Sequence, residues 1–302
     1  MHKWARIATF CKTCISGPLH IHLNMMSTIV FSAWLLLSSL LAGFLGALTG
    51  LGGGVVIVPV LTLLFHVDIH YAIGASLVSV IATSSGAAAS YVREGFSSVR
   101  IGMFLEVATT LGALFGAYLT TMVSAPTIGV IFGIVLLYSA WASFRTKHDT
   151  HTDKPDAMAL RLKLKGSFPA PAGEESYVAQ RVPAGFGLMY VAGTLSGLLG
   201  IGSGAVKVLA MDQAMRLPFK VSTTTSNFMI GVTAAASAGI YLSRGYIAPG
   251  LAMPVMLGVL AGSMLGAKVL VKAKVPLLRT IFALVIVALG FGMIYNSLAG
   301  KL

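Results

Sequence analysis

Ten apolar stretches follow one another along most of the chain, and they constrain its fold more than any other feature of the sequence. They cover residues 29–48, 55–65, 71–92, 101–122, 126–144, 184–200, 205–215, 221–242, 247–270 and 276–298. Most have the length of about 20 residues that an α-helix needs to cross a bilayer. Since lipid offers the backbone no hydrogen-bond partners, such stretches fold as helices. The sequence therefore predicts an all-α polytopic membrane protein.

The composition argues against the soluble alternatives. Hydrophobic residues make up 56% of the chain and charged residues 10%, more apolar surface than a soluble globule could bury. Few charges also argue against a disordered chain, a DNA-binding face and a soluble enzyme with a carboxylate-rich cleft. The net charge of +12 then reports which loops face the cytoplasm, and we expect no nucleic-acid partner.

No pattern in the sequence predicts a metal, a cofactor or an enzymatic activity. Cys11 and Cys14 form a single C-x-x-C pair in a hydrophilic tail, without the second pair that a zinc site would need. His66 and His70 flank a loop and lack an obvious third ligand, so we expect an interfacial structural role for them. The sequence also shows no nucleophile with a neighbouring base and orienting group.

Charge and proline divide the chain into four parts. Residues 1–28 form a basic, irregular N-terminal tail, and Met25 or Met26 offers a later start. A first membrane repeat covers 29–144, and a second covers 184–302. Between them, residues 145–183 gather charged side chains and prolines, which predicts a solvated cytoplasmic linker.

The second half of the sequence repeats the first at an offset of 150 residues. Matched pairs include Gly43 and Gly193, Gly50 and Gly200, Gly52 and Gly202, Tyr91 and Tyr241, and Pro126 and Pro276. Shared membrane composition alone would not keep such residues in register over about 100 positions, which indicates a duplication. We therefore expect two tandem repeats of about four transmembrane segments each, around a pseudo-twofold axis.

Each repeat contains an apolar stretch that is too short to span, directly after a glycine cluster. Residues 55–65 follow Gly50–Gly54, and residues 205–215 follow Gly200–Gly204. A helix broken at membrane depth survives only where protein or a water-filled cavity receives its backbone groups, so matched breaks indicate a transporter's binding site. The helix N-termini after the breaks favour an anion. Close packing of helices through glycine is the alternative.

The direction of the chain after each break is open at this stage. If each broken stretch makes one crossing, the two repeats are parallel. If it folds back as a hairpin, the repeats are inverted. Lysine and arginine are biased towards the linker side under both alternatives, so both place the linker in the cytoplasm.

Hydroxyl groups at helical spacing follow each break. They are Ser76, Ser79, Thr83 and Ser90 in the first repeat, and Ser222, Ser226, Thr233 and Ser237 in the second, with Thr225 and Asn227 nearby. Such donors replace the hydration shell of an oxyanion without a fixed charge that would trap it. Ordinary hydrogen bonding between helices, at about 0.6 kcal/mol per contact, is an equal alternative. For Gly112-x-x-x-Gly116 and Gly262-x-x-x-Gly266 we expect helix packing.

Lys207 is the most informative single residue. It lies three residues after the second break, where the first repeat has Ile57. An ammonium inside the membrane indicates a functional site, and here it would bind the anion. Snorkelling to the interface and pairing with Asp212 are the alternatives. Among the carboxylates only Glu106 lies within a predicted span, so a relay of several acids is poorly supported.

The stretch Gly43-Phe-Leu-Gly-Ala-Leu-Thr-Gly-Leu-Gly-Gly-Gly-Val-Val-Ile-Val-Pro59 resembles the signature of the TauE/SafE sulfite exporter family, and a degenerate copy recurs at 193–208. The resemblance covers residues 29–298. It implies a permease for small sulfur-containing anions such as sulfite, thiosulfate or organosulfonates, in the plasma membrane of a prokaryote.

These observations together predict an anion transporter whose site lies between the repeats. The candidate substrate-binding residues are Gly52, Gly53, Gly54, Ser76, Thr83, Gly202, Ser203, Gly204, Lys207, Thr225, Ser226 and Asn227. Export is favoured, because moving one negative charge out of a negative cytoplasm gains about 2.3 kcal/mol per 100 mV. The alternatives are a non-transporting subunit or scaffold that acts through the basic linker, and a metal-cation permease, which the scarcity of acids disfavours. The oligomeric state is open.

Overall fold

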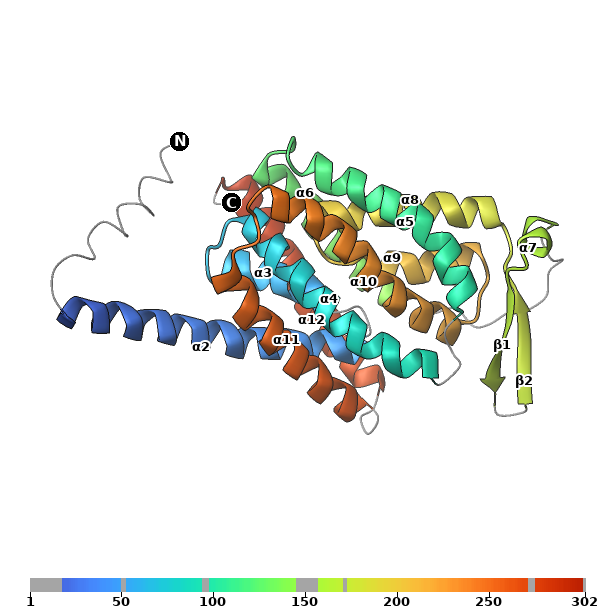
Figure 1. Ribbon diagram of the computed structural model, residues 1–302, viewed down its shortest axis with the longest axis horizontal. Coiled ribbons are helices and arrows are strands. Elements are labelled where there is room, and N and C mark those ends of the chain that lie inside the picture. Colours follow the sequence, from blue (N-terminus) through green and yellow to red (C-terminus); the bar gives the residue numbers. More distant parts are fainter. Residues whose placement is uncertain are drawn as a thin grey trace.

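The computed structural model describes residues 18–49, 53–93, 98–144, 157–170, 173–270 and 275–300, and helices dominate it (Figure 1). The first half contains α2 (Pro18–Thr49), α3 (Gly54–Leu63), α4 (Ile69–Arg93), α5 (Val99–Leu119) and α6 (Ala125–Phe144). The second contains α8 (Val182–Leu199), α9 (Gly204–Leu209), a π-helical turn η1 (Ala210–Ala214), α10 (Phe219–Ser243), α11 (Pro249–Leu270) and α12 (Val275–Leu298). The predicted all-α architecture is confirmed.

The bounds of the helices in the two halves correspond at the offset that the sequence showed. α4 and α10 begin at Ile69 and Phe219 and end at Arg93 and Ser243, each pair 150 positions apart. Packing between the halves is reciprocal too, since α2 packs on α11, α5 packs on α8, α4 packs on α10 and α6 packs on α12. The duplication itself stays a prediction, but each half buries its helices mainly against the other.

One expectation for the regions outside the membrane repeats, the irregular N-terminal tail, was wrong. The first helix begins at Pro18, inside the expected irregular tail, because residues 19–28 contain no glycine or proline that would end a helix. The expected solvated linker carries α7 (Ala157–Arg161) and a two-stranded antiparallel sheet of β1 (Lys165–Ala170) and β2 (Gly173–Val178).

The linker elements are anchored by a few apolar side chains among the charges. Leu164, Tyr177 and Ala179 are buried in one cluster with residues of α5, α8 and α10. The backbone N–H of Ala179 donates to the carbonyl of Leu164 at 3.0 Å. The charged composition of the linker did not indicate these contacts. Three buried side chains are enough to anchor a short hairpin, and they change the overall composition little.

Both short helices fold back along the helix before them. In the first half Gly53 lies against Gly43, and the ring of Phe65 contacts that of Phe31 edge-on at 5.7 Å between centroids. In the second half Ser203 Oγ donates to the carbonyl of Ala192 at 2.6 Å. The chain therefore follows the hairpin alternative at both breaks.

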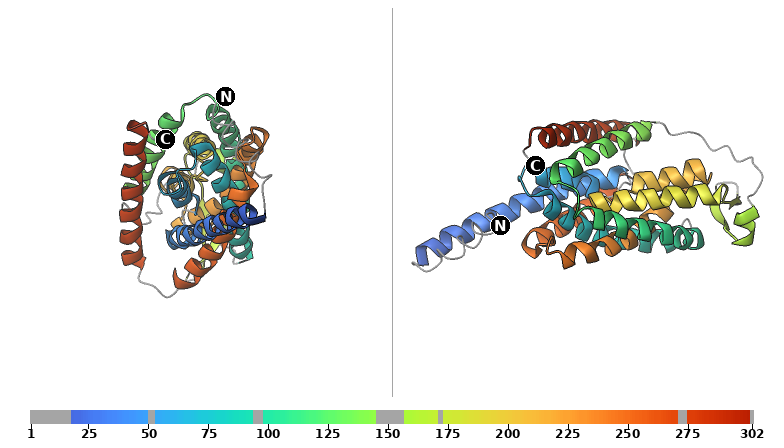
Figure 2. Two further views of the ribbon diagram at one scale, coloured as in Figure 1. Left: turned by 90° about the vertical axis from the view of Figure 1, so that its left-hand side faces the viewer. Right: turned by 90° about the horizontal axis from the view of Figure 1, so that it is seen from above.

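The hairpins set the direction of the two halves. Three long helices follow each hairpin, so each half ends at the opposite end of the bundle from where it began. Figures 1 and 2 show α7, β1 and β2 at one end and the last turn of α12 at the other. The two halves thus run through the bundle in opposite directions.

Glycines form the contact between α5 and α8. A Cβ atom at Gly112 or Gly116 would collide with the backbone of Tyr190 or Thr194, and one at Gly193 would collide with Thr109. The corresponding helices α2 and α11 meet in the same way, with Gly262 against the carbonyl of Leu40. The predicted packing role of Gly112, Gly116 and Gly262 is confirmed, and Gly266 lies outside the residues whose side chains are described.

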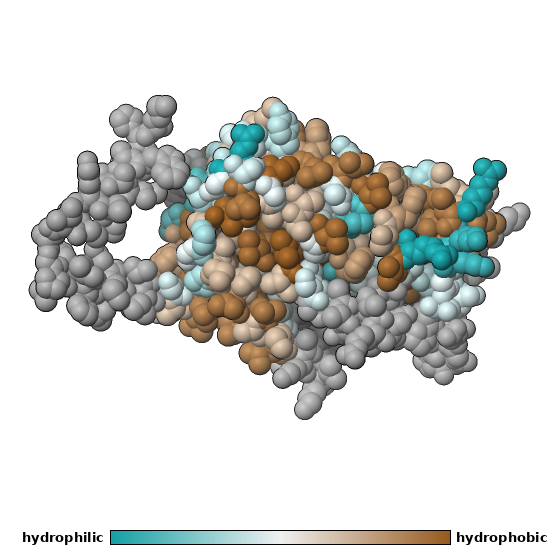
Figure 3. Space-filling model, in the orientation of Figure 1, coloured by the Kyte–Doolittle hydropathy of each residue, from teal (hydrophilic) through white to brown (hydrophobic). Residues whose placement is uncertain are grey.

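The outer surface of the bundle is apolar. Large hydrophobic side chains such as Met103, Val107 and Leu111 are exposed along one face of α5. Figure 3 shows apolar surface over the helical body and hydrophilic residues at the end that carries the linker. Within the described residues, Val99–Leu119 and Val182–Leu199 are both long and apolar enough to cross a membrane. Such a surface suits contact with lipid.

The glycine contact predicts a sharp difference between two substitutions. Gly116→Ala would push α8 away from α5, and we expect it to destabilise the protein by about 1–3 kcal/mol. Gly187→Ala on α8 meets open space, so it should leave stability unchanged or slightly raised. Thermal unfolding in detergent measures both, and equal midpoints for the two variants would contradict a packing role.

The opposite direction of the halves predicts that the linker and the C-terminus lie on different sides of the membrane. The test starts from a Cys11→Ser, Cys14→Ser background, which removes both native cysteines. Because the linker end gathers most of the lysines and arginines, Lys163→Cys should react with an impermeant maleimide only after permeabilisation. Ala299→Cys should react in intact cells. Labelling of both positions from one side would refute the arrangement.

Candidate functional site

The two helix breaks meet inside the protein. Ser76 on α4 donates its hydroxyl to the carbonyl of Gly200 at 2.8 Å, and the same oxygen lies 3.4 Å from the carbonyl of Gly54. A Cβ atom at Gly54 would lie 3.3 Å from the Gly200 carbonyl oxygen. The start of α3 is therefore in contact with the break that precedes α9.

The second break has the same local arrangement within its own half. Ser226 on α10 donates to the carbonyl of Gly204 at 3.3 Å, just as Ser76 faces Gly54. Gly202 packs against Ile230, and Gly54 packs against Val80. The two serine–glycine pairs, Ser76 with Gly54 and Ser226 with Gly204, stand at the offset of 150, so one serine in each half contacts the first carbonyl of its broken helix.

Backbone conformation explains the residue types of the second break. Gly200 and Gly202 have φ of +66° and +69°, a left-handed conformation that glycine adopts without strain. Ser203 adopts φ of +44° as a non-glycine residue, and its bond to the Ala192 carbonyl holds it there. Gly53, in contrast, is right-handed at φ of −64°, and Gly52 lies outside the described residues.

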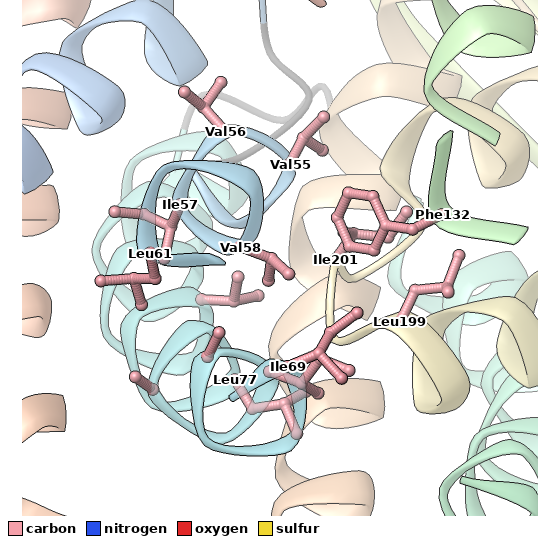
Figure 4. Packing of buried hydrophobic residues seen from close by; sticks show 14 of the residues in the cluster. Val55, Val56, Ile57, Val58, Leu61, Ile69, Leu77, Phe132, Leu199 and Ile201 are labelled. Carbon is pink, nitrogen blue, oxygen red and sulfur yellow. The ribbon is translucent and has the colours of Figure 1, made fainter. Parts of the chain in front are cut away.

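The breaks are closed in this conformation. Gly53, Gly54, Gly202, Ser203 and Gly204 are all buried. Figure 4 shows Leu199 and Ile201, which flank the second break, beside Phe132, in the same buried cluster as the side chains of α3. The predicted water-filled chamber between the halves stays a prediction.

The remaining predicted hydroxyl and amide residues are more dispersed. Thr83 is half-buried and donates to the carbonyl of Ser79 in its own helix at 3.0 Å. Thr225 is buried, and its hydroxyl accepts the backbone N–H of Ser98 at 3.1 Å, at the start of α5. Asn227 is half-buried. The structure thus brings Ser76 and Ser226 to the breaks, but it shows Thr83 and Thr225 with other partners.

Lys207 is fully buried one turn after the second break. Its backbone N–H donates to the carbonyl of Ser203, and its Nζ lies 2.5 Å from Thr233 Oγ1 on α10. Thr233 Oγ1 in turn lies 2.7 Å from Oε1 of Glu106 on α5. The snorkelling alternative is wrong, because the whole side chain is buried, and its contact is with Thr233 rather than Asp212.

Glu106 is the functional candidate that the site prediction left out. The signal was present, because Glu106 is an acid inside a span and the second half has Met256 at the matching position. Lys207 likewise stands where the first half has Ile57. The acid and the base are therefore two departures from the repeat, and the fold brings them to opposite sides of one threonine hydroxyl.

The two histidines contribute to the surface rather than to this site. His70 Nδ1 lies 2.9 Å from Asp68 Oδ1, and its ring stacks on that of Tyr246 at 5.0 Å between centroids. Among the described residues, no group of three or more His, Cys, Asp and Glu side chains could hold a metal ion.

Comparison with known proteins gives one consistent result. Residues 35–293 match the family described as sulfite exporter TauE/SafE. The probable membrane transporter protein YunE of Bacillus subtilis is 28% identical over 87% of this chain and 97% of its own length. YdhB of the same organism, also named a probable membrane transporter, is 30% identical over 77% of this chain and 86% of its own length. No solved structure matches.

The contact between the breaks predicts a measurable role for Ser76. Ser76→Ala leaves the buried carbonyl of Gly200 without that donor, which we expect to cost about 1–3 kcal/mol of stability. Ser79→Ala is the matched control, because that buried hydroxyl donates to the Ala75 carbonyl of its own helix. Thermal unfolding in detergent should separate the two variants, and an unchanged midpoint for Ser76→Ala would show that the contact is unimportant.

Proposed function

Because the chain belongs to the TauE/SafE sulfite exporter family, and is therefore a membrane transporter, we propose that it carries small sulfur-containing anions out of the cell. Sulfite, thiosulfate and organosulfonates are the substrates that this proposal covers, and the plasma membrane is the site of action. The family's description supports both the substrate class and the outward direction. Its partners in this proposal are the anion and the lipid bilayer.

The observation that carries the proposal is a buried ammonium next to a helix break that contacts its counterpart in the other half. Lys207 is fully buried, and it lies one turn after the break whose Gly200 carbonyl accepts the Ser76 hydroxyl. Glu106, on the far side of Thr233, provides the opposite charge. The Lys207 ammonium contacts a neutral hydroxyl and not a carboxylate, so an anion could bind the ammonium without first breaking a direct ion pair.

The breaks supply the other binding groups. The first turn of α3 leaves backbone N–H groups without partners in the helix, and a helix N-terminus attracts negative charge. Ser76 adds a hydroxyl donor from the first half, and Ser226 adds one from the second half. In the closed conformation these hydroxyls donate to carbonyls of the breaks, so an entering oxyanion would have to take their place.

Alternating access then follows from movement of one bundle against the other. The two halves cross the membrane in opposite directions, and the breaks lie where the halves meet. An anion held at this contact would face one side when one bundle tilts and the other side when it tilts back. No step in this cycle involves a covalent reaction.

Removal of Lys207 should abolish transport without abolishing the fold, provided that its partner is neutralised too. Lys207→Met alone leaves Glu106 buried without its counter-charge, which costs about 3–5 kcal/mol. The double variant Lys207→Met, Glu106→Gln removes both charges, so we expect it to fold and to lose anion flux by about tenfold or more.

Efflux of labelled sulfite and methanesulfonate from proteoliposomes measures this loss. Lys163→Met is the control, because Lys163 is exposed in the linker, far from the breaks in the chain. We expect this control to keep the wild-type flux. Wild-type flux in the folded double variant would remove Lys207 from the binding site.

A further inference from the structure

Glu106 is a buried acid with half of its hydrogen-bonding capacity unused. Oε1 lies 2.7 Å from Thr233 Oγ1 and 3.2 Å from Thr110 Oγ1. Oε2 is buried and has no hydrogen-bond partner among the described residues. The residue as a whole is 8% exposed. A carboxylate oxygen in such a place is costly, and it would be stabilised by a proton.

Lys207 is the charged group that faces Glu106. Among the described side chains, the helices packed against Glu106 carry two other titratable groups, which are tyrosines with other contacts. Tyr190 of α8 stacks on Phe115. Tyr241 of α10 donates to the carbonyl of Gly197 at 3.1 Å. The charge of Glu106 is therefore balanced by one ammonium through one hydroxyl.

We propose that Glu106 couples a proton to the transported anion. The inference rests on the proposed function, in which the anion binds Lys207. When the anion arrives, it takes over as the counter-ion of the ammonium and leaves Glu106 as an unbalanced buried carboxylate. Glu106 then takes one proton from water at Oε2, forming one O–H bond while one breaks in the donor, and it returns the proton when the anion leaves.

Charge balance is the physical reason for this exchange. The empty site holds Lys207 as an ammonium and Glu106 as a carboxylate, with no net charge. The loaded site holds the ammonium, a singly charged anion and a neutral carboxylic acid, again with no net charge. Burying an extra negative charge is far more costly than adding a proton to the acid. The anion and the proton therefore cross together, and a singly charged substrate moves without net charge.

This coupling changes what drives transport. A lone anion is pushed outward by the membrane potential, whereas an anion with a proton is not. For a singly charged substrate the direction then depends on the concentrations of the anion and of protons on each side. Potential dependence and proton movement are thus two independent readouts.

The test uses the purified full chain in liposomes loaded with methanesulfonate or 2-hydroxyethanesulfonate. Both probes stay ionised near neutral pH, so any proton that accompanies them is carried by the protein. Labelled efflux is followed together with an internal pH dye, while potassium and valinomycin set the potential. Wild-type protein should release a proton with each anion, and its efflux rate should not respond to the potential.

Glu106→Gln keeps the shape and the acceptor oxygen of the side chain but cannot take a proton. It leaves Lys207 without its counter-charge, so we expect a lower unfolding midpoint. The folded variant should transport the probes with proton movement reduced to that of empty liposomes, and with a rate that now follows the potential. Asp68→Asn is the matched control, since it removes a carboxylate at the exposed end of the bundle. It should behave as the wild type does.

Several outcomes would overturn the inference. Wild-type efflux without a pH change, or efflux driven by the potential, would refute proton coupling even if Glu106→Gln failed to fold. Proton movement that persists in Glu106→Gln would assign the coupling to another group. If neither probe nor sulfite leaves wild-type liposomes, the proposed function fails first, so the two failures are distinguishable.

Discussion

The structure depends on one constraint, which is that backbone groups freed inside a membrane must find partners in the protein. Each broken helix frees such groups, and each half supplies a serine to the first carbonyl of its own broken helix. Ser76 also crosses to the other half, where it donates to Gly200. The breaks are therefore stable because they are buried against each other, and neither half would be stable without its counterpart.

The helices were predictable from the sequence because a membrane-spanning helix needs a long apolar run, and such a run is visible in the sequence itself. The direction of the chain at the breaks was not, because a glycine cluster permits both continuation and reversal. The reversal of the chain is fixed by contacts across each break, such as Phe31 with Phe65 and Ser203 with Ala192. Hydropathy does not show which residues make these contacts. The start of α2 was missed because hydropathy marks the entry into lipid rather than the end of helical hydrogen bonding.

The binding groups were only partly predictable for a related reason. Lys207 was visible because a charge in a span is rare, but its partner was not, since helix periodicity carries no information about which helices meet. Comparing the two halves would have pointed to Glu106 as the partner of Lys207, because each is a charged residue whose counterpart in the other half is apolar. Two halves of similar shape provide the framework, and one acid and one base make it chemically asymmetric.

The same contacts indicate which parts move together. α5 and α8 meet through glycines on both sides, with backbone against backbone, and close packing of this kind leaves no side chains that could rearrange. Thr233 and Lys207 tie α10 and α9 to Glu106 on α5, so these helices share one polar network. Ser76 joins α4 to the break after α8 by one hydrogen bond, beside a packing contact between Ile73 and Gly200. Opening at the breaks would separate both, and an oxyanion that accepts the freed Ser76 hydroxyl would offset the loss of the hydrogen bond.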